Sequence, residues 1–262
     1  NDSIITDDNA RFISCGGDKH LFLWDVLSGQ VIRRFEGHDR SVNALAFGPR
    51  QEVALSASHD KTVRVWDMRS HTKRPIQMMA DATDSVLCIC VVGDEIITGS
   101  ADGALRKYDV RRGQLCTDCF PHPVGSISSS RDNQCILVST LNHKISLVES
   151  QTGHVLTSFT GHVNDRFKVQ SALDPSGSIV ASGSEDNSLF FWDLVEARVC
   201  HTMQHHSSPV FCVQFFEDTL VTASADGMLK VWRIALESSG GAQTPLREGG
   251  KLETMHASRR SV

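Results

Sequence analysis

The sequence has no apolar run long enough to cross a membrane, and no secretory signal is visible in it. It also lacks a basic surplus, because 26 Lys and Arg face 31 Asp and Glu for a net charge of −5. General binding to nucleic acid or to anionic membranes usually requires such a surplus. We therefore expect neither a membrane nor a direct nucleic-acid partner.

Several motifs that would signal chemistry are also missing. Cys116 and Cys119 have zinc-like spacing, but a structural zinc site needs four ligands and no second pair of this kind exists. No G-x-S-x-G elbow and no phosphate-cradling glycine loop is present. We expect no metal, no cofactor and no small-molecule substrate. The eight cysteines fall mostly within apolar strand patterns, which is typical of reduced thiols in a cytoplasmic or nuclear protein.

What the sequence does contain is a repeat. Six times, a Trp-Asp pair or a degenerate copy of it closes a run of alternating apolar residues, at spacings of 42, 42, 40, 44 and 40 residues. These closers are Trp24-Asp25, Trp66-Asp67, Tyr108-Asp109, Val148-Glu149, Trp192-Asp193 and Trp232-Arg233. Self-similarity near this period predicts a repeat architecture built from small antiparallel sheets, with the third strand of each sheet ending at its closer.

Each repeat carries further polar markers at fixed places. Six residues before the closer stands an Asp, or an Asn in the fourth repeat: Asp18, Asp60, Asp102, Asn142, Asp186 and Asp226. These types hydrogen-bond their own backbone in tight turns. Eight residues before the closer stands a small or hydroxyl residue: Gly16, Ser58, Ser100, Thr140, Ser184 and Ser224. Between turn and closer the pattern is strand-like, as in Thr62–Trp66.

Histidines add a fourth marker. His38 and His162 follow a glycine, His122 and His206 hold the same place in two further copies, and the third repeat has none. The resulting Ser, His and Asp sets could suggest nucleophilic catalysis. An active site is rarely built three times at a fixed period, so we interpret the sets as structural and the protein as no enzyme.

The structural interpretation predicts a buried hydrogen-bond chain in which the Trp donates to the hydroxyl and the His bridges to the Asp. The second, fifth and sixth repeats should carry complete tetrads, and the third and fourth should be looser. Asp186→Ala should then cost about 1–3 kcal/mol. The predicted tetrads are His38, Ser58, Asp60 and Trp66; His162, Ser184, Asp186 and Trp192; and His206, Ser224, Asp226 and Trp232.

The pattern is the WD-repeat signature, and longer stretches resemble one family within it. The stretches include Phe12–Asp18, Gly29–His38, Trp66–Ser70, Asp102–Arg106, Asp109–Gly113 and Ser184–Leu194. In order and spacing they are similar to the mitogen-activated protein kinase organizer family, also called WD repeat domain-containing protein 83. The resemblance implies a non-enzymatic scaffold for the extracellular-signal-regulated kinase (ERK) cascade and for spliceosomal complexes in pre-mRNA splicing, in cytoplasm and nucleus.

The predicted fold is an all-β WD-repeat β-propeller over residues 1–236, followed by a mobile tail over 237–262. Because the family has one more repeat at its N-terminus, we expect a ring one blade short of seven, with a poorly packed seam that favours oligomerisation. The competing expectation is a closed six-bladed ring whose last outer strand is Lys251–Met255.

Partner proteins should contact the turns between the second and third strands and the loops between sheets, because loops on a rigid scaffold carry function. The candidate residues flank structural positions and are Arg40, His59, Arg166, Lys168 and Glu185. The rival interpretation makes them ordinary exposed loop residues.

An alternative function is that of a substrate receptor for a cullin-type ubiquitin ligase. Some WD proteins bind the ligase adaptor through a box that ends in Trp-Asp-x-Arg. The segment ending at Trp66-Asp67 and Arg69 fits this box except at Ala54, and the one ending at Tyr108-Asp109 and Arg111 fits except at Lys107. The box overlaps the plain repeat pattern, so the match is weakly specific.

Overall fold

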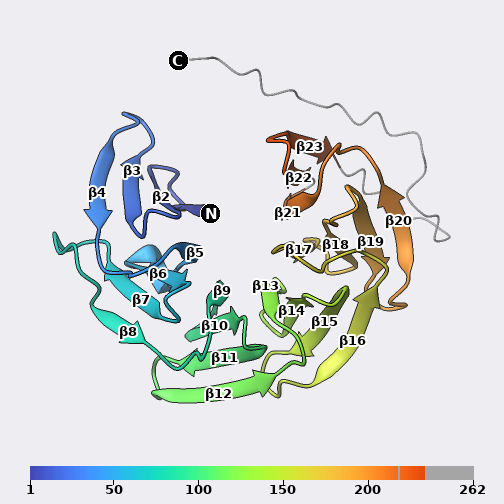
Figure 1. Cartoon of the computed structure of the whole chain (residues 1–262), viewed down its shortest axis with the longest axis horizontal. Coiled ribbons are helices and arrows are strands. Elements are labelled where there is room, and N and C mark those ends of the chain that lie inside the picture. The colour runs from blue at the N-terminus through green and yellow to red at the C-terminus, as the bar shows by residue number, and fades with distance from the viewer. Residues whose placement is uncertain (218, 234–262) are drawn as a thin grey trace. The chain divides into compact units, whose positions relative to one another are not determined.

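The computed structural model describes residues 1–217 and 219–233 (Figure 1). The chain divides into two compact units, Asn1–Ile127 and Ser128–Val262. The described residues form strands β1 to β23, and the helical element among them is a single short 3₁₀ helix, η1 (Pro49–Gln51). The structure is therefore all-β, as the repeats predict. It consists of six antiparallel sheets, which we call blades one to six in chain order.

The first unit contains blades one to three, each a meander of four consecutive strands. Blade one has β1 (Asp2–Ile5), β2 (Arg11–Cys15), β3 (Leu21–Asp25) and β4 (Val31–Phe35). Blade two has β5 (Val42–Phe47), β6 (Val53–Ser58), β7 (Val63–Asp67) and β8 (Gln77–Met79). Blade three has β9 (Val86–Val92), β10 (Glu95–Ser100), β11 (Ala104–Asp109) and β12 (Gln114–Cys119).

Blades four to six follow the same strand order. Blade four has β13 (Val124–Ser129), β14 (Cys135–Thr140), β15 (Lys144–Glu149) and β16 (Val155–Thr160). Blade five has β17 (Ser171–Leu173), β18 (Ile179–Ser182), β19 (Leu189–Asp193) and β20 (Val199–Met203). Blade six has β21 (Val210–Phe216), β22 (Thr219–Ser224) and β23 (Leu229–Arg233). Its described part is three-stranded, and the expected fourth strand, Lys251–Met255, lies outside the described residues.

The third strand of every blade ends at its closer, which confirms the phase of the repeat. The acidic residue of the closer explains why the strand stops there. In blade one the Asp25 carboxylate accepts the backbone N–H groups of Leu27 at 2.8 Å and Ser28 at 3.2 Å. Asp67, Asp109 and Asp193 bind the matching N–H groups of their own blades. The Asp thus fixes the turn into the outer strand.

The apolar core lies between successive blades within each unit. Residues one and three before a closer are buried against the closer of the next blade. Leu23 and Leu21 share a cluster with Trp66, and Phe191 and Leu189 share one with Trp232. Because strand side chains alternate between faces, this spacing places both residues on the same side of the sheet. Each blade therefore needs a neighbour to bury its apolar face. The extent of the propeller, 1–236, and the closure of the ring stay predictions.

Candidate functional site

Blade two contains a continuous hydrogen-bond chain from its closing tryptophan to its turn aspartate. The Trp66 indole Nε1 donates to the Ser56 hydroxyl at 2.8 Å, and that hydroxyl lies 2.6 Å from Nε2 of His38. Nδ1 of His38 lies 2.7 Å from Asp60 Oδ2. Ser56 is fully buried, and His38 is also buried. The chain ties the loop before β5 to the turn between β6 and β7.

The direction of the chain follows from what each group can do. An indole N–H only donates and an ionised carboxylate only accepts, so the Ser56 oxygen accepts from Trp66 and the Nδ1–H group of His38 donates to Asp60. Burial acts to raise the pKa of Asp60, but hydrogen bonds from His38, Thr62 and the Asp39 backbone N–H outweigh it and hold the pKa well below its usual range. A buried network in which every member is paired stabilises the blade.

The hydroxyl predicted from the sequence for this hydrogen-bond chain was the wrong one. Ser58 was predicted, but the structure uses Ser56, ten residues before the closer. Trp66 pairs across the ladder with Ala54, so its indole reaches the diagonal residue Ser56. Ser58 lies four residues beyond Ala54, about 13 Å along the strand, which is too far. Instead, the Ser58 hydroxyl donates to the Ser41 carbonyl at 2.9 Å and accepts the Asp60 N–H at 3.1 Å.

The contacts of Ser56, His38 and Asp60 repeat the order of a hydrolytic triad. They cannot act as one, because Ser56 is 0% exposed and its oxygen is already engaged by the Trp66 indole. A nucleophile must reach the carbon that it attacks. The geometry therefore supports a structural role.

Blade six has most of the same hydrogen-bond chain, with a threonine in the place of Ser56. Trp232 Nε1 donates to the Thr222 hydroxyl at 3.0 Å, and Nε2 of His206 lies 2.8 Å from the same oxygen. Ser224 was predicted in this place and instead donates to Asp226. Nδ1 of His206 has no hydrogen-bond partner among the described residues, so the contact with Asp226 is not made. Burial, with the Lys230 charge adding to it, lowers the pKa of His206.

Blade five holds the same residue types without assembling them, contrary to the prediction. Trp192 donates to the Thr160 carbonyl at 2.9 Å, and Ser184 accepts the Val163 N–H at 2.9 Å. Neither ring nitrogen of His162 has a partner among the described residues, and its ring instead meets Trp192 edge to face. Among the described residues, the hydrogen bond shown for the Asp186 carboxylate is the one from the Ser188 N–H, at 3.0 Å.

His162 lies in a connection that is longer than its counterpart in blade two. This connection runs from residue 161 to 170, whereas the matching connection in blade two runs from 36 to 41. Burial lowers the pKa of His162 to about 4, and the nearby His143 adds to this effect against the opposing Asp186. The histidine is therefore a neutral, buried group near pH 7.

Blade three, expected to be looser, has a substitute for its missing histidine. The Arg106 guanidinium is buried and lies 2.8 Å from Asp102 Oδ2, with a second bond of 2.7 Å to the Ser100 hydroxyl. Burial, with the nearby Asp81 charge adding to it, raises the pKa of Tyr108 to about 12. The turn is thus tied by an ion pair in place of the histidine, and the looseness of this blade stays a prediction.

In the first unit, the structure places two of the predicted partner-binding residues at neighbouring loops. Arg40 is exposed in the connection from β4 to β5, and His59 is exposed in the turn from β6 to β7. The His59 N–H donates to the Ser41 carbonyl at 2.9 Å, and the Asp39 N–H donates to Asp60 at 3.0 Å. Both side chains therefore project from a backbone that the buried chain of blade two holds in place.

In the second unit, the predicted residues gather at the long connection of blade five. Arg166 is exposed and Lys168 half-buried in it, and Glu185 lies in the adjoining turn from β18 to β19. Glu185 was expected to have no structural duty, which is wrong. One carboxylate oxygen accepts three successive backbone N–H groups, from Asp165, Arg166 and Phe167, at 2.9, 2.7 and 2.9 Å. Burial acts to raise the pKa of Glu185, but these bonds outweigh it and lower the pKa.

Sequence reasoning missed Phe167 on this connection. Its side chain is 48% exposed, and its ring lies 5.3 Å from that of Phe211. A large aromatic residue in a charged loop was the available signal. Phe and Arg are both enriched in protein interfaces, and here Phe167 and Arg166 are exposed side by side in the sequence. We call residues 163–168 the blade-five loop.

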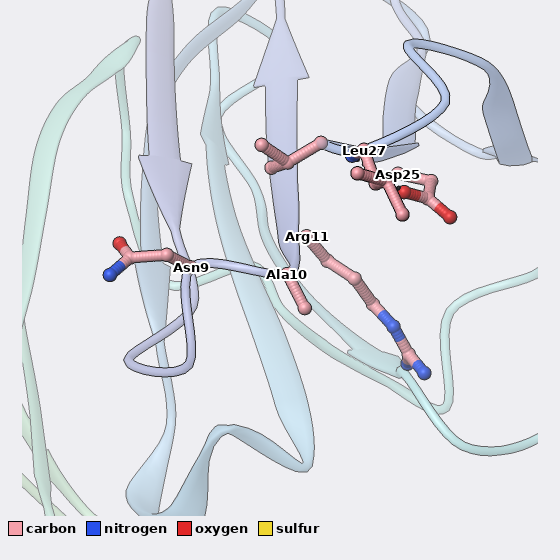
Figure 2. Close-up of a pocket in the computed structure, with 6 residues that line it drawn as sticks. Asn9, Ala10, Arg11, Asp25 and Leu27 are labelled. Atoms are coloured by element: carbon pink, nitrogen blue, oxygen red, sulfur yellow. Dashed lines mark hydrogen bonds between the residues drawn. The ribbon is translucent and has the colours of Figure 1, made fainter.

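Blade one has a hollow on its surface. Figure 2 shows a shallow hollow in blade one, and its exposed or half-buried lining is Asn9, Ala10, Arg11, Asp25, Val26 and Leu27. Among the described residues no cluster of His, Cys, Asp or Glu is arranged to hold a metal. Cys116 and Cys119 are free and exposed in the outer strand β12. No helix in the described ranges is long and apolar enough to span a membrane.

Comparison with known proteins agrees with this geometry. The WD domain, G-beta repeat family matches residues 29–67, 153–193 and 197–233. The chain is 40% identical to human WD repeat domain-containing protein 83, over 88% of this chain and 87% of that protein. The rat protein of the same name is 38% identical over the same shares, and a Dictyostelium discoideum homolog is 29% identical over 88% and 80%.

This chain belongs to the WD repeat domain-containing protein 83 family. Its fold is the WD-repeat β-propeller, and WD repeats imply a platform for protein interactions. The three matched segments end at the closers of blades two, five and six, the blades that combine the histidine with a closing tryptophan. Each matched segment thus contains the histidine, the turn aspartate and the closing tryptophan of its blade.

Proposed function

We propose that the chain is a non-enzymatic scaffold that assembles protein complexes in the MAP kinase (ERK) cascade and in pre-mRNA splicing, in cytoplasm and nucleus. Its partners in this proposal are proteins rather than nucleic acids, membranes or small molecules. Similarity to the WD repeat domain-containing protein 83 family over 88% of the chain supports the pathway. The acidic balance, with a net charge of −5, supports the choice of proteins over nucleic acids.

The observation that carries the scaffold proposal is the way the blade-five loop is held. The Glu185 carboxylate fixes three backbone N–H groups of the loop, while Phe167 and Arg166 remain exposed. A surface that is ordered before binding loses less conformational entropy when a partner arrives. The first unit has a smaller counterpart in Arg40 and His59, which also project from a fixed backbone.

Affinity purification of the tagged chain, followed by mass spectrometry, tests this proposal. Cytoplasmic and nuclear extracts should be run separately, with a variant that carries Phe167→Ala and Arg166→Glu as the matched control. We expect kinase-cascade components in the first extract and splicing factors in the second, both depleted with the variant. Recovery of neither class would overturn the proposed pathways, and equal recovery with the variant would remove the blade-five loop from the binding surface.

The ubiquitin-ligase alternative is favoured by one observation. Arg69 and Arg111, the arginines of the two box-like segments, have side chains that are 69% and 78% exposed. Arg69 is paired with Glu52 at 3.1 Å and Arg111 with Asp94 at 3.0 Å, so both are held at the surface. If the chain is a substrate receptor, the same purification should recover a cullin-ligase adaptor, and Arg69→Ala with Arg111→Ala should abolish its recovery.

A further inference from the structure

The connection from β7 to β8 in blade two concentrates positive charge in a chain that is acidic as a whole. Residues 69–74 read Arg-Ser-His-Thr-Lys-Arg, whereas the net charge of the chain is −5. Lys73 and Arg74 are exposed, and among the described residues no carboxylate pairs with either side chain. The neighbouring Arg69, by contrast, is paired with Glu52 at 3.1 Å. The charges of Lys73 and Arg74 are therefore available to a partner.

Two exposed apolar side chains follow these charges directly. Ile76 is 58% exposed and Met78 is 55% exposed. Met78 lies in β8, which is the edge strand of the blade-two sheet. Exposed aliphatic side chains that gather beside polar ones are typical of interaction sites. Residues 73–78, which we call the blade-two segment, thus have a positively charged end and an apolar end.

The backbone of the blade-two segment is held in place by the rest of its unit. The Lys73 carbonyl accepts the Glu36 N–H at 2.8 Å, and the Ile76 N–H donates to a carbonyl of β7 at 2.8 Å. Pro75 packs closely on Gly37, since a Cβ atom at residue 37 would lie 3.1 Å from Cδ of Pro75. A segment that is ordered before binding loses less conformational entropy when it meets a partner.

We propose that the blade-two segment docks in a groove of a partner kinase, and that this groove is acidic at one end and apolar along the rest. Acidic side chains of the groove pair with Lys73 and Arg74, and its apolar floor covers Ile76 and Met78. The choice of a kinase rests on the proposed function, whereas the chemistry of the groove follows from the segment. The segment is a second binding surface, in addition to the blade-five loop.

The apolar end favours a protein over the two other partners that a basic segment attracts. A nucleic acid presents phosphates to Lys73 and Arg74 but leaves Ile76 and Met78 in water. An anionic membrane is usually recognised by a cluster of roughly four to eight basic residues, more than this segment supplies. Both partners are therefore outcomes that the test must separate from kinase binding.

Binding of the full chain to purified ERK, measured by isothermal titration calorimetry at low and high salt, tests the charged end. Lys73→Glu with Arg74→Glu should weaken binding by about tenfold or more, because it brings like charges together. The affinity of the parent chain should also fall as salt rises, since exposed charges are screened. Arg131→Glu with Arg198→Glu is the matched control and should bind normally, because it changes the net charge equally at exposed positions of the second unit.

The apolar end is tested in the same titration by a second pair of changes. Ile76→Ser with Met78→Ser should weaken binding by about tenfold or more, because it removes the side chains that the groove buries. Val155→Ser with Leu156→Ser is the matched control and should bind normally. These two residues are 42% and 53% exposed in β16, the outer strand of blade four.

Full binding by either variant of the blade-two segment, or equal weakening by its control, would overturn the proposal and leave the scaffold function standing. A parent chain that does not bind the kinase would overturn it as well, and the affinity purification decides separately whether the proposed pathways hold. Binding to single-stranded RNA or to phosphatidylserine vesicles in place of the kinase, abolished by Lys73→Glu with Arg74→Glu, would assign the segment to another class of partner. Circular dichroism checks that each variant is folded, and Ile76→Ala with Met78→Ala replaces the serine pair if that pair fails to fold.

Discussion

At the scale of single residues, the partners of the hydroxyl ten positions before a closer differ from blade to blade. In blade two Ser56 joins Trp66 to His38, whereas in blade one the matching Ser14 accepts the Trp24 indole at 2.9 Å with no histidine beyond it. The same residue type at the same repeat position thus binds a tryptophan and a histidine in blade two but only a tryptophan in blade one.

We expect Ser56→Ala to lower the free energy of unfolding by about 1–3 kcal/mol, because it leaves two buried polar groups without partners. Ser14→Ala should cost less, since only one half-buried indole loses its acceptor. Urea denaturation of the two variants measures the difference. Equal losses would show that the chain through His38 adds nothing.

The same reasoning revises the expectation for Asp186. Its side chain accepts one N–H and does not bind His162, whereas Asp60 accepts bonds from His38, Thr62 and Asp39. We now expect Asp186→Ala to change stability by less than about 0.5 kcal/mol, as for ordinary surface substitutions. Asp60→Ala should cost clearly more in the same denaturation assay, and the reverse order would contradict the account.

His162 should make the stability of the fold depend on pH. Burial lowers its folded pKa to about 4 from a usual value of 6.5, so between these values the unfolded chain binds the proton more readily. Stability should therefore fall as the pH drops from about 6.5 toward 4, by about 3 kcal/mol in total at roughly 1.4 kcal/mol per pKa unit.

His162→Phe is the variant that tests this dependence, because it keeps a ring against Trp192 and removes the titrating group. Urea midpoints of the parent chain and the variant should diverge between pH 7 and pH 5, with the variant losing less stability. If both chains lose the same amount, His162 does not carry a lowered pKa.

At the scale of elements, the sequence predicted strands and turns well because the pattern that encodes them is local. Alternating apolar residues and a turn-forming aspartate specify β6, β7 and the turn between them within a few residues. The diagonal contact from Trp66 to Ser56 depends on the register between neighbouring strands. The repeat pattern does not give this register, and for that reason Ser58 and Ser224 were assigned in place of Ser56 and Thr222. The unpaired His162 depends on a loop conformation that no repeat pattern encodes.

The role of Glu185 could not be predicted either, because its partners are backbone N–H groups, which every residue except proline has. We expect Glu185→Ala to raise the hydrogen-exchange rates of the Asp165, Arg166 and Phe167 amides by on the order of tenfold, the usual loss for bonds to a charged group. Glu185→Gln should have a smaller effect, because it keeps an acceptor oxygen. Unchanged exchange in both variants would mean that the blade-five loop is ordered without the carboxylate.

At the scale of the whole molecule, the six blades follow from the repeat, which is encoded six times over, whereas the family follows from longer stretches of similarity. The spacing of blades and the closure of the ring remain predictions, because they depend on packing between surfaces rather than on any motif. The identity of the partner is harder still to predict from the sequence, because propellers with the same kind of blade bind different proteins.

The most direct test of the scaffold account is the affinity of a purified partner for two charge-reversed chains. The first chain carries Arg40→Glu and Arg166→Glu, in the loops that we propose to contact the partner. The second chain is the control: it carries Arg111→Glu and Arg112→Glu, in the turn after a closer, and its net charge changes by the same amount. The account predicts that the first pair weakens binding at least about tenfold, as expected for interface arginines, while the melting temperature stays nearly unchanged and the second pair binds normally. Full binding by the first pair and loss of binding by the second would contradict it.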